Sequence, residues 1–378
     1  MTDTGERTDG PEYAVVIPTL GRPSLSVTLR ALADAKGPAP RRVVLVDDRR
    51  LEDCTPLPAD IPTELAPLVE IAPGCAAGPA AARNIGWRAA PEPWTVFLDD
   101  DVVPGPTWAD DLAADLAAAG PGTGGVQARI TVPLPEDRRP TDWERTTAGL
   151  ASARWITADM AYRRAALAAV GGFDERFPRA FREDADLALR VMAAGWRLER
   201  GSRTTVHPVR PANRWVSVRT QAGNADDVLM AKVHGRGWWH RAGAPRGRLP
   251  RHLAIAAAGA AALTGALAGR RRAAAAGAAL WLAGTAEFAL ARIRPGPRTP
   301  DELATMAVTS AVIPPVATAH WLAGLCGTAR PPRSGGRRPG APGRSGMGSA
   351  WSRLVMERPG YSVPVFATYA PKYPFVTG

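Results

Sequence analysis

Short apolar runs alternate with helical patterns over the first 100 residues. The runs at 13–18, 43–46 and 95–98 are rich in β-branched residues and predict buried strands. Between them, apolar residues recur at helical spacing after Ser24 and again over 78–90. Strands that are apolar throughout and alternate with helices predict the α/β class, here a Rossmann-like, mostly parallel sheet with helices on both faces.

After residue 100 the pattern predicts further helices over 108–119, 155–170 and 185–194. Beyond about Trp239 the composition changes, and alanine-rich apolar stretches replace the mixed pattern. A third apolar stretch, 303–327, is broken by two adjacent prolines, which predicts an interrupted helix. Four parts are therefore expected: a disordered N-terminus over 1–11, an α/β domain over 12–240, apolar helices over 241–329, and a disordered basic linker and tail over 330–378.

The formal charge of +11 comes almost entirely from arginine, and the arginines crowd the C-terminal third of the chain. Basic residues beside apolar segments indicate an anionic membrane surface. The chain has no nucleic-acid-binding fingerprint. Three widely separated cysteines argue against a disulfide framework and a structural zinc site. The polar, acidic N-terminus lacks the pattern of a signal peptide, so we expect the first domain to stay in the cytosol.

Three adjacent carboxylates follow the third predicted strand, at Asp99, Asp100 and Asp101. Ligands of parallel α/β sheets bind at the carboxyl ends of the strands, and these acids lie at such an end. Neighbouring carboxylates repel one another unless positive charge lies among them. A divalent cation held by oxygen ligands and substrate phosphates meets that need, whereas a solvated acidic turn is the structural alternative.

Seven motifs, in this order and spacing, resemble those of family 2 glycosyltransferases, which have the GT-A fold. The resemblance covers roughly residues 13–207. The motifs are VVIPTLGR (15–22), VVLVDD (43–48), GPAAARNIGW (78–87), FLDDDVVP (97–104), ADMAYRRAAL (158–167), GGFDERF (171–177) and FREDADLALRVMAAGW (181–196). The resemblance implies an inverting transferase of the hexosyltransferase type that takes its sugar from a nucleotide-sugar, UDP- or GDP-linked, and requires Mn²⁺ or Mg²⁺.

The resemblance also implies roles for residues in the first half of the domain. Asp48 matches the acid that hydrogen-bonds the nucleotide base, and Pro18 and Thr19 line the same pocket. Arg83 matches the basic residue that faces the donor diphosphate, where a guanidinium pairs well with phosphate oxygens. A solvated helical arginine is the alternative at that position.

The acidic triplet matches the DxD motif of the family. Asp99 and Asp101 fit its outer positions, and Asp101 is the stronger candidate for direct contact with the metal. Asp100 fills the variable middle position on the donor side, either as a further donor contact or as a bystander. His207 lies where some relatives place a histidine near the metal, although a lone histidine beside a strand is more often structural.

The pair Glu183 and Asp184 matches the acids on the acceptor side of the family's site. Asp184 begins a predicted helix, and we expect the positive helix end to keep it ionised as the general base. An N-terminal capping acid without a catalytic role is the alternative. The chain departs from the family at Asp159, where Asn or Gly is common, and an additional acid there is expected to alter a pocket.

The apolar C-terminal part approaches the ~20 residues that a membrane span requires. Its basic clusters conflict with a simple hairpin across a bilayer, because Arg270, Arg271 and Arg272 would lie outside. We therefore expect association with the cytoplasmic face of the plasma membrane, with at least one segment in the interface. A lipid-linked or cell-envelope acceptor is a hypothesis that depends on this region alone, and a soluble helical extension is the alternative.

Two other function classes remain as alternatives. A sugar-phosphate nucleotidyltransferase would carry a Gly- and Lys-rich phosphate loop after the first strand, but that position has the sequence TLGRPS. A non-catalytic, membrane-bound interaction protein with a GT-A-like domain would have no need for Asp99, Asp101 and Asp184. Turnover of a nucleotide-sugar distinguishes these classes from a glycosyltransferase.

Overall fold

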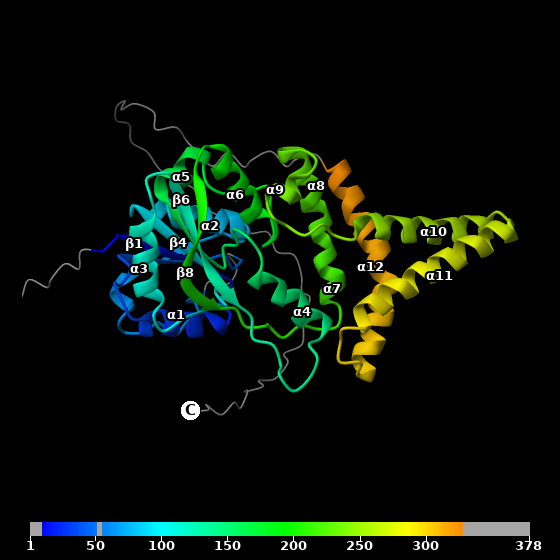
Figure 1. The fold of residues 1–378 in the computed structure, drawn as a ribbon, viewed down its shortest axis with the longest axis horizontal. Helices are drawn as coiled ribbons and strands as arrows, with labels where there is room; N and C mark the ends of the chain where they lie inside the picture. The colour runs from blue at the N-terminus through cyan, green and yellow to red at the C-terminus, as the bar shows by residue number, and fades with distance from the viewer. Residues whose placement is uncertain (1–9, 51–54, 328–378) are drawn as a thin grey trace, which may run out of the picture. The chain divides into compact units, whose positions relative to one another are not determined.

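The computed structural model describes residues 10–50 and 55–327. The predicted disorder of residues 1–9 and 330–378 lies outside this part of the chain. The described strands form a single sheet of eight, in the order β3-β2-β1-β4-β7-β6-β8-β5 (Figure 1). Their bounds in chain order are β1 (Tyr13–Thr19), β2 (Arg42–Asp47), β3 (Val69–Pro73), β4 (Trp94–Leu98), β5 (Val103–Pro104), β6 (Thr123–Thr131), β7 (Asp159–Arg163) and β8 (Arg197–Val206).

The sheet is mixed rather than uniformly parallel. Strands β3, β2, β1 and β4 are parallel neighbours. The three apolar runs predict β1, β2 and β4, whereas β3 was not predicted. Strand β7 runs antiparallel to both β4 and β6, while β8 pairs parallel with β6 and antiparallel with β5. The α/β class is confirmed, with four parallel and three antiparallel pairings along the sheet.

Helices cover both faces of the sheet. Successive side chains of a strand point to opposite faces, so each strand contributes apolar side chains to the helices on both. Val15 and Ile17 of β1 pack in one core cluster with residues of α1 and α3. Val16, between them, packs on the other face with residues of α2, α5 and α6. The helices of this part are α1 (Ser24–Asp34), α2 (Pro79–Ala89), α3 (Trp108–Ala118), α4 (Asp142–Ala148), α5 (Arg164–Val170) and α6 (Glu183–Ala193).

One predicted helix is wrong in its first half. The stretch 155–170 contains strand β7 followed by the short helix α5. Met160 and Tyr162 of β7 are completely buried between neighbouring strands. An apolar segment that is buried on both sides has no clear period, so its pattern does not distinguish a strand from a helix.

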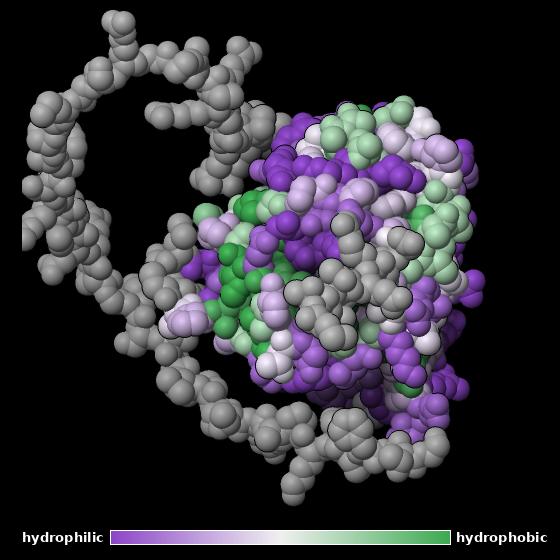
Figure 2. Space-filling view, turned by 90° about the vertical axis from the view of Figure 1, so that its left-hand side faces the viewer, coloured by the Kyte–Doolittle hydropathy of each residue, from purple (hydrophilic) through white to green (hydrophobic). Residues whose placement is uncertain are grey.

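The remaining described helices follow the sheet. Short 3₁₀ turns at Ala66–Leu68, Gly149–Ala151 and Thr220–Ala222 connect some of the elements. Figure 2 looks onto the side of the molecule that lies at the left in Figure 1, where hydrophilic residues cover most of the surface and hydrophobic areas are smaller. The helices are α7 (Val216–Arg219), α8 (Gly223–His234), α9 (Trp238–Arg241), α10 (Leu249–Leu267), α11 (Arg271–Ile293) and α12 (Pro300–Cys326).

The predicted interruption of the last apolar stretch is also wrong, because α12 continues through Pro314 and Pro315. Pro314 is buried, and its carbonyl accepts a hydrogen bond from the Thr318 hydroxyl at 2.8 Å. A proline removes one intrahelical hydrogen bond, but packing on either side holds the helix together. The predicted boundary at residue 240 stays a prediction.

Candidate active site

The carboxyl ends of β1, β2 and β4 meet at one edge of the sheet, where they carry Thr19, Asp48 and Asp99. Parallel pairing of these strands places their ends side by side. Polar residues that follow each strand therefore gather there, although the chain separates them by up to 80 residues.

Asp99, Asp101 and His207 come together at this edge. Each offers one ligand atom, and these atoms lie within 4.8 Å of one another. The Nδ1 atom of His207 is 3.1 Å from the carbonyl oxygen of Pro208. Because a carbonyl only accepts, Nδ1 is the donor of this contact, and the neutral form of such an imidazole offers the lone pair of Nε2 to a cation. Nε2 itself lies 3.9 Å from Asp101 Oδ1.

Asp101 lies where negative charge is poorly solvated. Burial raises the pKa of its carboxyl group, and the charge of Asp99 raises it further, while His207 and Arg210 oppose the shift. Nε of Arg210 lies 2.8 Å from Asp101 Oδ2, on a side chain that is half exposed. Two carboxylates and one imidazole are a donor set that suits Mn²⁺, and they also accept Mg²⁺. The three side chains therefore fit a divalent cation.

Asp100, the middle residue of the triplet, is already engaged by the first strand and its turn. Its carboxylate accepts hydrogen bonds from the Thr19 hydroxyl at 2.7 Å and from Arg22 at 2.9 Å. Thr19 Oγ1 also accepts from the backbone N–H of Gly21 at 3.0 Å. The structure thus places Asp100 and Thr19 together, in a network that holds the β1 turn against the end of β4.

Asp48 holds the loop that leads into α2. Its two carboxylate oxygens accept from the backbone N–H groups of Ala77 and Gly78, at 2.8 and 2.9 Å. Burial raises the pKa of Asp48, and these two hydrogen bonds oppose the shift. Pro18, the other residue predicted for the nucleotide pocket, is partly buried within β1.

Arg83 joins the two acidic parts of the site. Its guanidinium donates to Asp99 Oδ1 at 2.7 Å and to Glu183 Oε1 at 2.9 Å. Its side chain is only 3% exposed, so these carboxylates replace the water that a buried guanidinium loses. The alternative of a solvated helical arginine is therefore wrong. Its predicted contact with a diphosphate stays a prediction.

Glu183 and Asp184 form the first turn of α6. The preceding residue, Arg182, has a left-handed backbone with φ of 75°, a conformation uncommon for residues other than glycine. Burial raises the pKa of Glu183 to about 8, and the charge of Asp184 adds to the shift, against the effect of Arg83. Burial also raises the pKa of Asp184, whose Oδ1 accepts from the backbone N–H of Ala185 at 2.7 Å. The positive end of α6 was expected to keep Asp184 ionised, and burial of its carboxyl group opposes that effect.

Asp159 does not enter a pocket, contrary to the expectation for an additional acid. It is completely buried, and it accepts from Trp108 Nε1 at 2.6 Å, Thr205 Oγ1 at 2.5 Å and Arg203 Nε at 2.9 Å. These partners belong to α3 and β8. The additional acid is therefore part of a polar network within the core.

Sequence reasoning missed three arginines around the site. Arg22 and Arg210 pair with Asp100 and Asp101, and Arg182 pairs with Asp227 at 2.8 Å. Arg22 ends the first motif, Arg210 lies three residues after His207, and Arg182 directly precedes Glu183. That proximity is the signal that would have found them.

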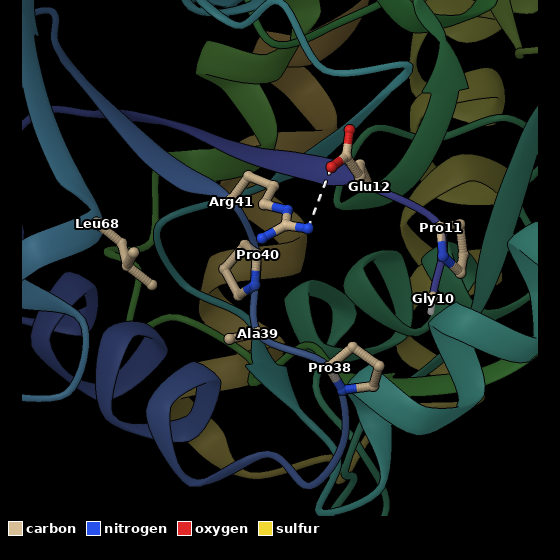
Figure 3. Close-up of a pocket in the computed structure, with 8 residues that line it drawn as sticks. All are labelled: Gly10, Pro11, Glu12, Pro38, Ala39, Pro40, Arg41 and Leu68. Atoms are coloured by element: carbon tan, nitrogen blue, oxygen red, sulfur yellow. Dashed lines mark ion pairs between the residues drawn. The ribbon is translucent and has the colours of Figure 1, made fainter. Parts of the chain in front are cut away.

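A cavity of about 270 Å³ lies at the opposite edge of the sheet (Figure 3). Its lining includes Glu12 and Arg41, an ion pair at 3.1 Å that directly precedes β1 and β2. Prolines make up much of the remaining wall. The acidic cluster is at the carboxyl ends of these strands, so the cavity is not part of that site.

Part of the chain is similar to known proteins. Residues 14–176 match the family model described as glycosyl transferase family 2. A 104-residue segment is 31% identical to the hyaluronan synthase of Pasteurella multocida. That segment is 27% of this chain and only 11% of the hyaluronan synthase, so the chain spans a small part of that protein.

Similar solved structures include a mannosyltransferase of Pyrobaculum calidifontis in complex with GDP-Man and Mn²⁺. The two chains are 20% identical with a TM-score of 0.49, over 83% of this chain and 88% of the other. TarS (residues 1–349) of S. aureus in complex with UDP is 18% identical with a TM-score of 0.36, over 58% and 65% of the two chains. Glu183, Asp184 and His207 lie beyond the family match. The family model and the strand-end motifs within it show that this chain carries a glycosyl transferase family 2 domain.

Proposed function

We propose that the protein transfers a hexosyl group from a UDP- or GDP-linked donor to an acceptor hydroxyl, with inversion at the anomeric carbon. The observation that carries this proposal is the connection between the two acidic clusters. Arg83 bonds to Asp99 on the donor side and to Glu183 at the start of α6. In the proposal, this buried side chain links the cation site to the start of the helix that carries the general base.

Asp99, Asp101 and His207 would hold a Mn²⁺ or Mg²⁺ ion. When bound, such an ion supplies Lewis acidity that offsets the charge on a departing nucleoside diphosphate. In the proposal, Asp48, Pro18 and Thr19 face the nucleotide of the donor. Arg83 faces its diphosphate, and Asp100 is a further contact to the donor. Thr19 and Asp100 would act partly through the network that fixes the β1 turn.

Asp184 is the better candidate for the general base of the acidic pair. Glu183 Oε1 is bound to Arg83, whereas Asp184 is partly exposed and accepts only from the backbone of Ala185 among the hydrogen bonds of the described residues. A raised pKa moves a carboxylate toward the operating pH, which favours proton transfer. Asp184 would accept the proton of the acceptor hydroxyl as that oxygen attacks the anomeric carbon from the side opposite the diphosphate.

Release of nucleotide from a panel of UDP- and GDP-hexoses tests this function. We expect turnover in the full-length protein with Mn²⁺, and a loss on the order of 10²- to 10⁴-fold for Asp184→Asn, with donor affinity retained. Asp60→Asn, at an exposed carboxylate, is the matched control. Nuclear magnetic resonance of the product distinguishes inversion from retention.

No turnover with any donor would favour the non-catalytic interaction protein. Release of pyrophosphate from a nucleoside triphosphate and a sugar phosphate would favour the nucleotidyltransferase. Equal turnover in Asp184→Asn would contradict the assignment of the base while leaving the transferase activity intact.

We also propose that the protein works at the cytoplasmic face of a membrane, on a lipid-linked or cell-envelope acceptor. Helices α11 and α12 are long and apolar enough to cross a bilayer by length and composition. Removal of the region after Trp239 is not a clean test, because Lys232 of α8 binds carbonyl oxygens near the end of α12. Turnover of a soluble and a lipid-linked acceptor by the full-length chain tests the proposal, and equal rates would contradict it.

A further inference from the structure

Helices α10 and α11 lie side by side (Figure 1). Small residues fill part of the contact between them. A Cβ atom added at Gly277 would lie 2.6 Å from the backbone nitrogen of Ala262. One added at Gly265 would lie 2.8 Å from the backbone nitrogen of Ala274. At these two glycines the helices therefore approach too closely for larger side chains to enter between them.

Four leucines of this helical hairpin point away from the contact. Leu263 and Leu267 of α10 are 62% and 81% exposed, and Leu280 and Leu282 of α11 are 67% and 58% exposed. A hairpin in water gains stability by placing its leucines between the helices. The reverse arrangement leaves an exposed apolar surface, which indicates a partner.

Charge identifies the chemistry of that partner. Arg270, Arg271 and Arg272 form the exposed turn between the helices. Glu287 is the only acid in the sequence from Leu249 to Ile293, and it is paired with Arg251 at 3.2 Å. No acid within the hairpin therefore neutralises the positive charge of the turn. A second copy of the chain would not neutralise it either, because it would bring the same positive charge. An anionic phospholipid surface complements both the arginines and the leucines.

The uncharged stretch of α11 is too short for a bilayer crossing, although the whole helix is long enough. Residues 273–286 of α11 are uncharged, and at 1.5 Å per residue they extend about 21 Å. The hydrocarbon core of a bilayer is about 30 Å thick. An upright hairpin would leave the three arginines of the turn in hydrocarbon, where each costs a few kcal/mol. A hairpin that lies along the leaflet places them among the headgroup phosphates.

Helix α12 is fixed at both ends to the glycosyltransferase domain. Near its start, Glu302 Oε1 accepts from the backbone N–H of Asp142 at 2.8 Å. Near its end, the carbonyl of Gly324 accepts from Lys232 Nζ at 2.9 Å. A helix with both ends on the domain supports the hairpin and does not cross a membrane.

The end of α11 is joined to the same support. Arg292 is buried, and it bonds to Asp142 at 2.7 Å and to Thr309 of α12 at 2.8 Å. Ile255, Phe288 and Ile313 pack together beside it, one from each of α10, α11 and α12. The hairpin is therefore held rigidly at its base and free at its turn.

We propose that the α10–α11 hairpin is an in-plane membrane anchor that binds the surface of an anionic phospholipid leaflet through the arginines of its turn and its outward leucines. This inference rests on the membrane association proposed above, and it specifies the element and the lipid chemistry. It differs from a transmembrane anchor because both ends of the hairpin and the turn remain on one side of the bilayer.

The test is sedimentation of the full-length protein with vesicles of phosphatidylcholine alone or with added phosphatidylglycerol. We expect binding to the anionic vesicles, and release by alkaline carbonate. Replacement of Arg270, Arg271 and Arg272 by Gln should weaken binding on the order of 100-fold. Replacement of Leu263, Leu267, Leu280 and Leu282 by Gln should weaken it at either lipid composition. The charge-matched control replaces Arg30, Arg41 and Arg129, which are exposed elsewhere, and should bind as the wild type does.

Three results would overturn the proposal. The wild type remains in the supernatant with anionic vesicles, or both hairpin variants bind as tightly as the wild type, or the protein resists extraction as a spanning protein does. Nucleotide release measured in the same preparations separates these failures from a failure of the transferase. If both hairpin variants bind vesicles as the wild type does, the hairpin is not the membrane anchor, although the protein still associates with membranes.

Discussion

Asp101 and Asp159 are both buried acids, but their partners give them opposite roles. Asp159 accepts from three side chains that are fixed in the core, one of them the guanidinium of Arg203, and these donors stabilise its charge. Asp101 faces Asp99, Nε2 of His207 and the half-exposed Arg210. Its raised pKa reflects that incomplete compensation. Such a carboxylate is stabilised by a further cation, which supports Asp101 as a metal ligand.

Glu183 gives a prediction on pH at the residue scale. Its pKa is about 8 in the folded protein against 4.5 ordinarily, so the native state holds an additional proton between these values. The free energy of unfolding of the metal-free protein should therefore fall as pH rises from about 4.5 to 8. Glu183→Gln keeps an acceptor for Arg83 and should remove this part of the slope.

Urea unfolding of the two proteins at several pH values, in the presence of a chelator, checks the prediction. Glu64→Gln, at an exposed position, should keep the slope of the wild type. A slope in Glu183→Gln equal to that of the wild type would show that the native carboxyl group does not bind the additional proton.

The candidate metal residues were predictable from motifs, but their connection was not. Asp99 and Asp101 follow a recognisable strand, and His207 was named from the resemblance, although it lies over 100 residues away. No pattern indicates that Arg83 bonds to both Asp99 and Glu183, because that contact depends on how α2 and α6 pack on the same face of the sheet.

At the scale of elements, apolar periodicity predicted the helices and strands with clear patterns. Helices α1 and α3 begin at the expected residues, Ser24 and Trp108. It failed at β7, which is buried on both sides and therefore has no period. It also failed at Pro314, because tertiary packing of α12 outweighs a local helix-breaking preference.

Asp159 joins β7 to α3 and β8, so its loss should destabilise the sheet. Asp159→Asn leaves Arg203 with an uncharged partner. Its amide nitrogen would also place donors where Oδ2 now accepts from Trp108 and Thr205. Removal of one partner from a buried ion pair costs about 3–5 kcal/mol, and we expect a loss of that order in the free energy of unfolding. Urea unfolding measures it. Asp60→Asn, an exposed residue, should change it by less than about 0.5 kcal/mol, and equal effects in the two variants would contradict the role of Asp159.

At the scale of the whole molecule, the sequence predicted a basic, apolar C-terminal part without its arrangement. The structure shows that small residues face one another and leucines face outward in α10 and α11. Composition does not reveal that reversal, because alanine and glycine occur throughout both helices. The attachment of α12 to Asp142 and Lys232 was likewise not predictable, since it depends on residues over 90 positions apart.

The central claim is that Asp99, Asp101 and His207 hold the cation that binds a nucleotide-sugar donor. Calorimetric titration of UDP and GDP, with and without Mn²⁺, into the full-length wild type and Asp101→Ala tests it most directly. We predict metal-dependent binding of one nucleotide by the wild type and its loss, at least about tenfold, in the variant. Binding of neither nucleotide under any condition, or equal metal-dependent binding by both proteins, would contradict the claim.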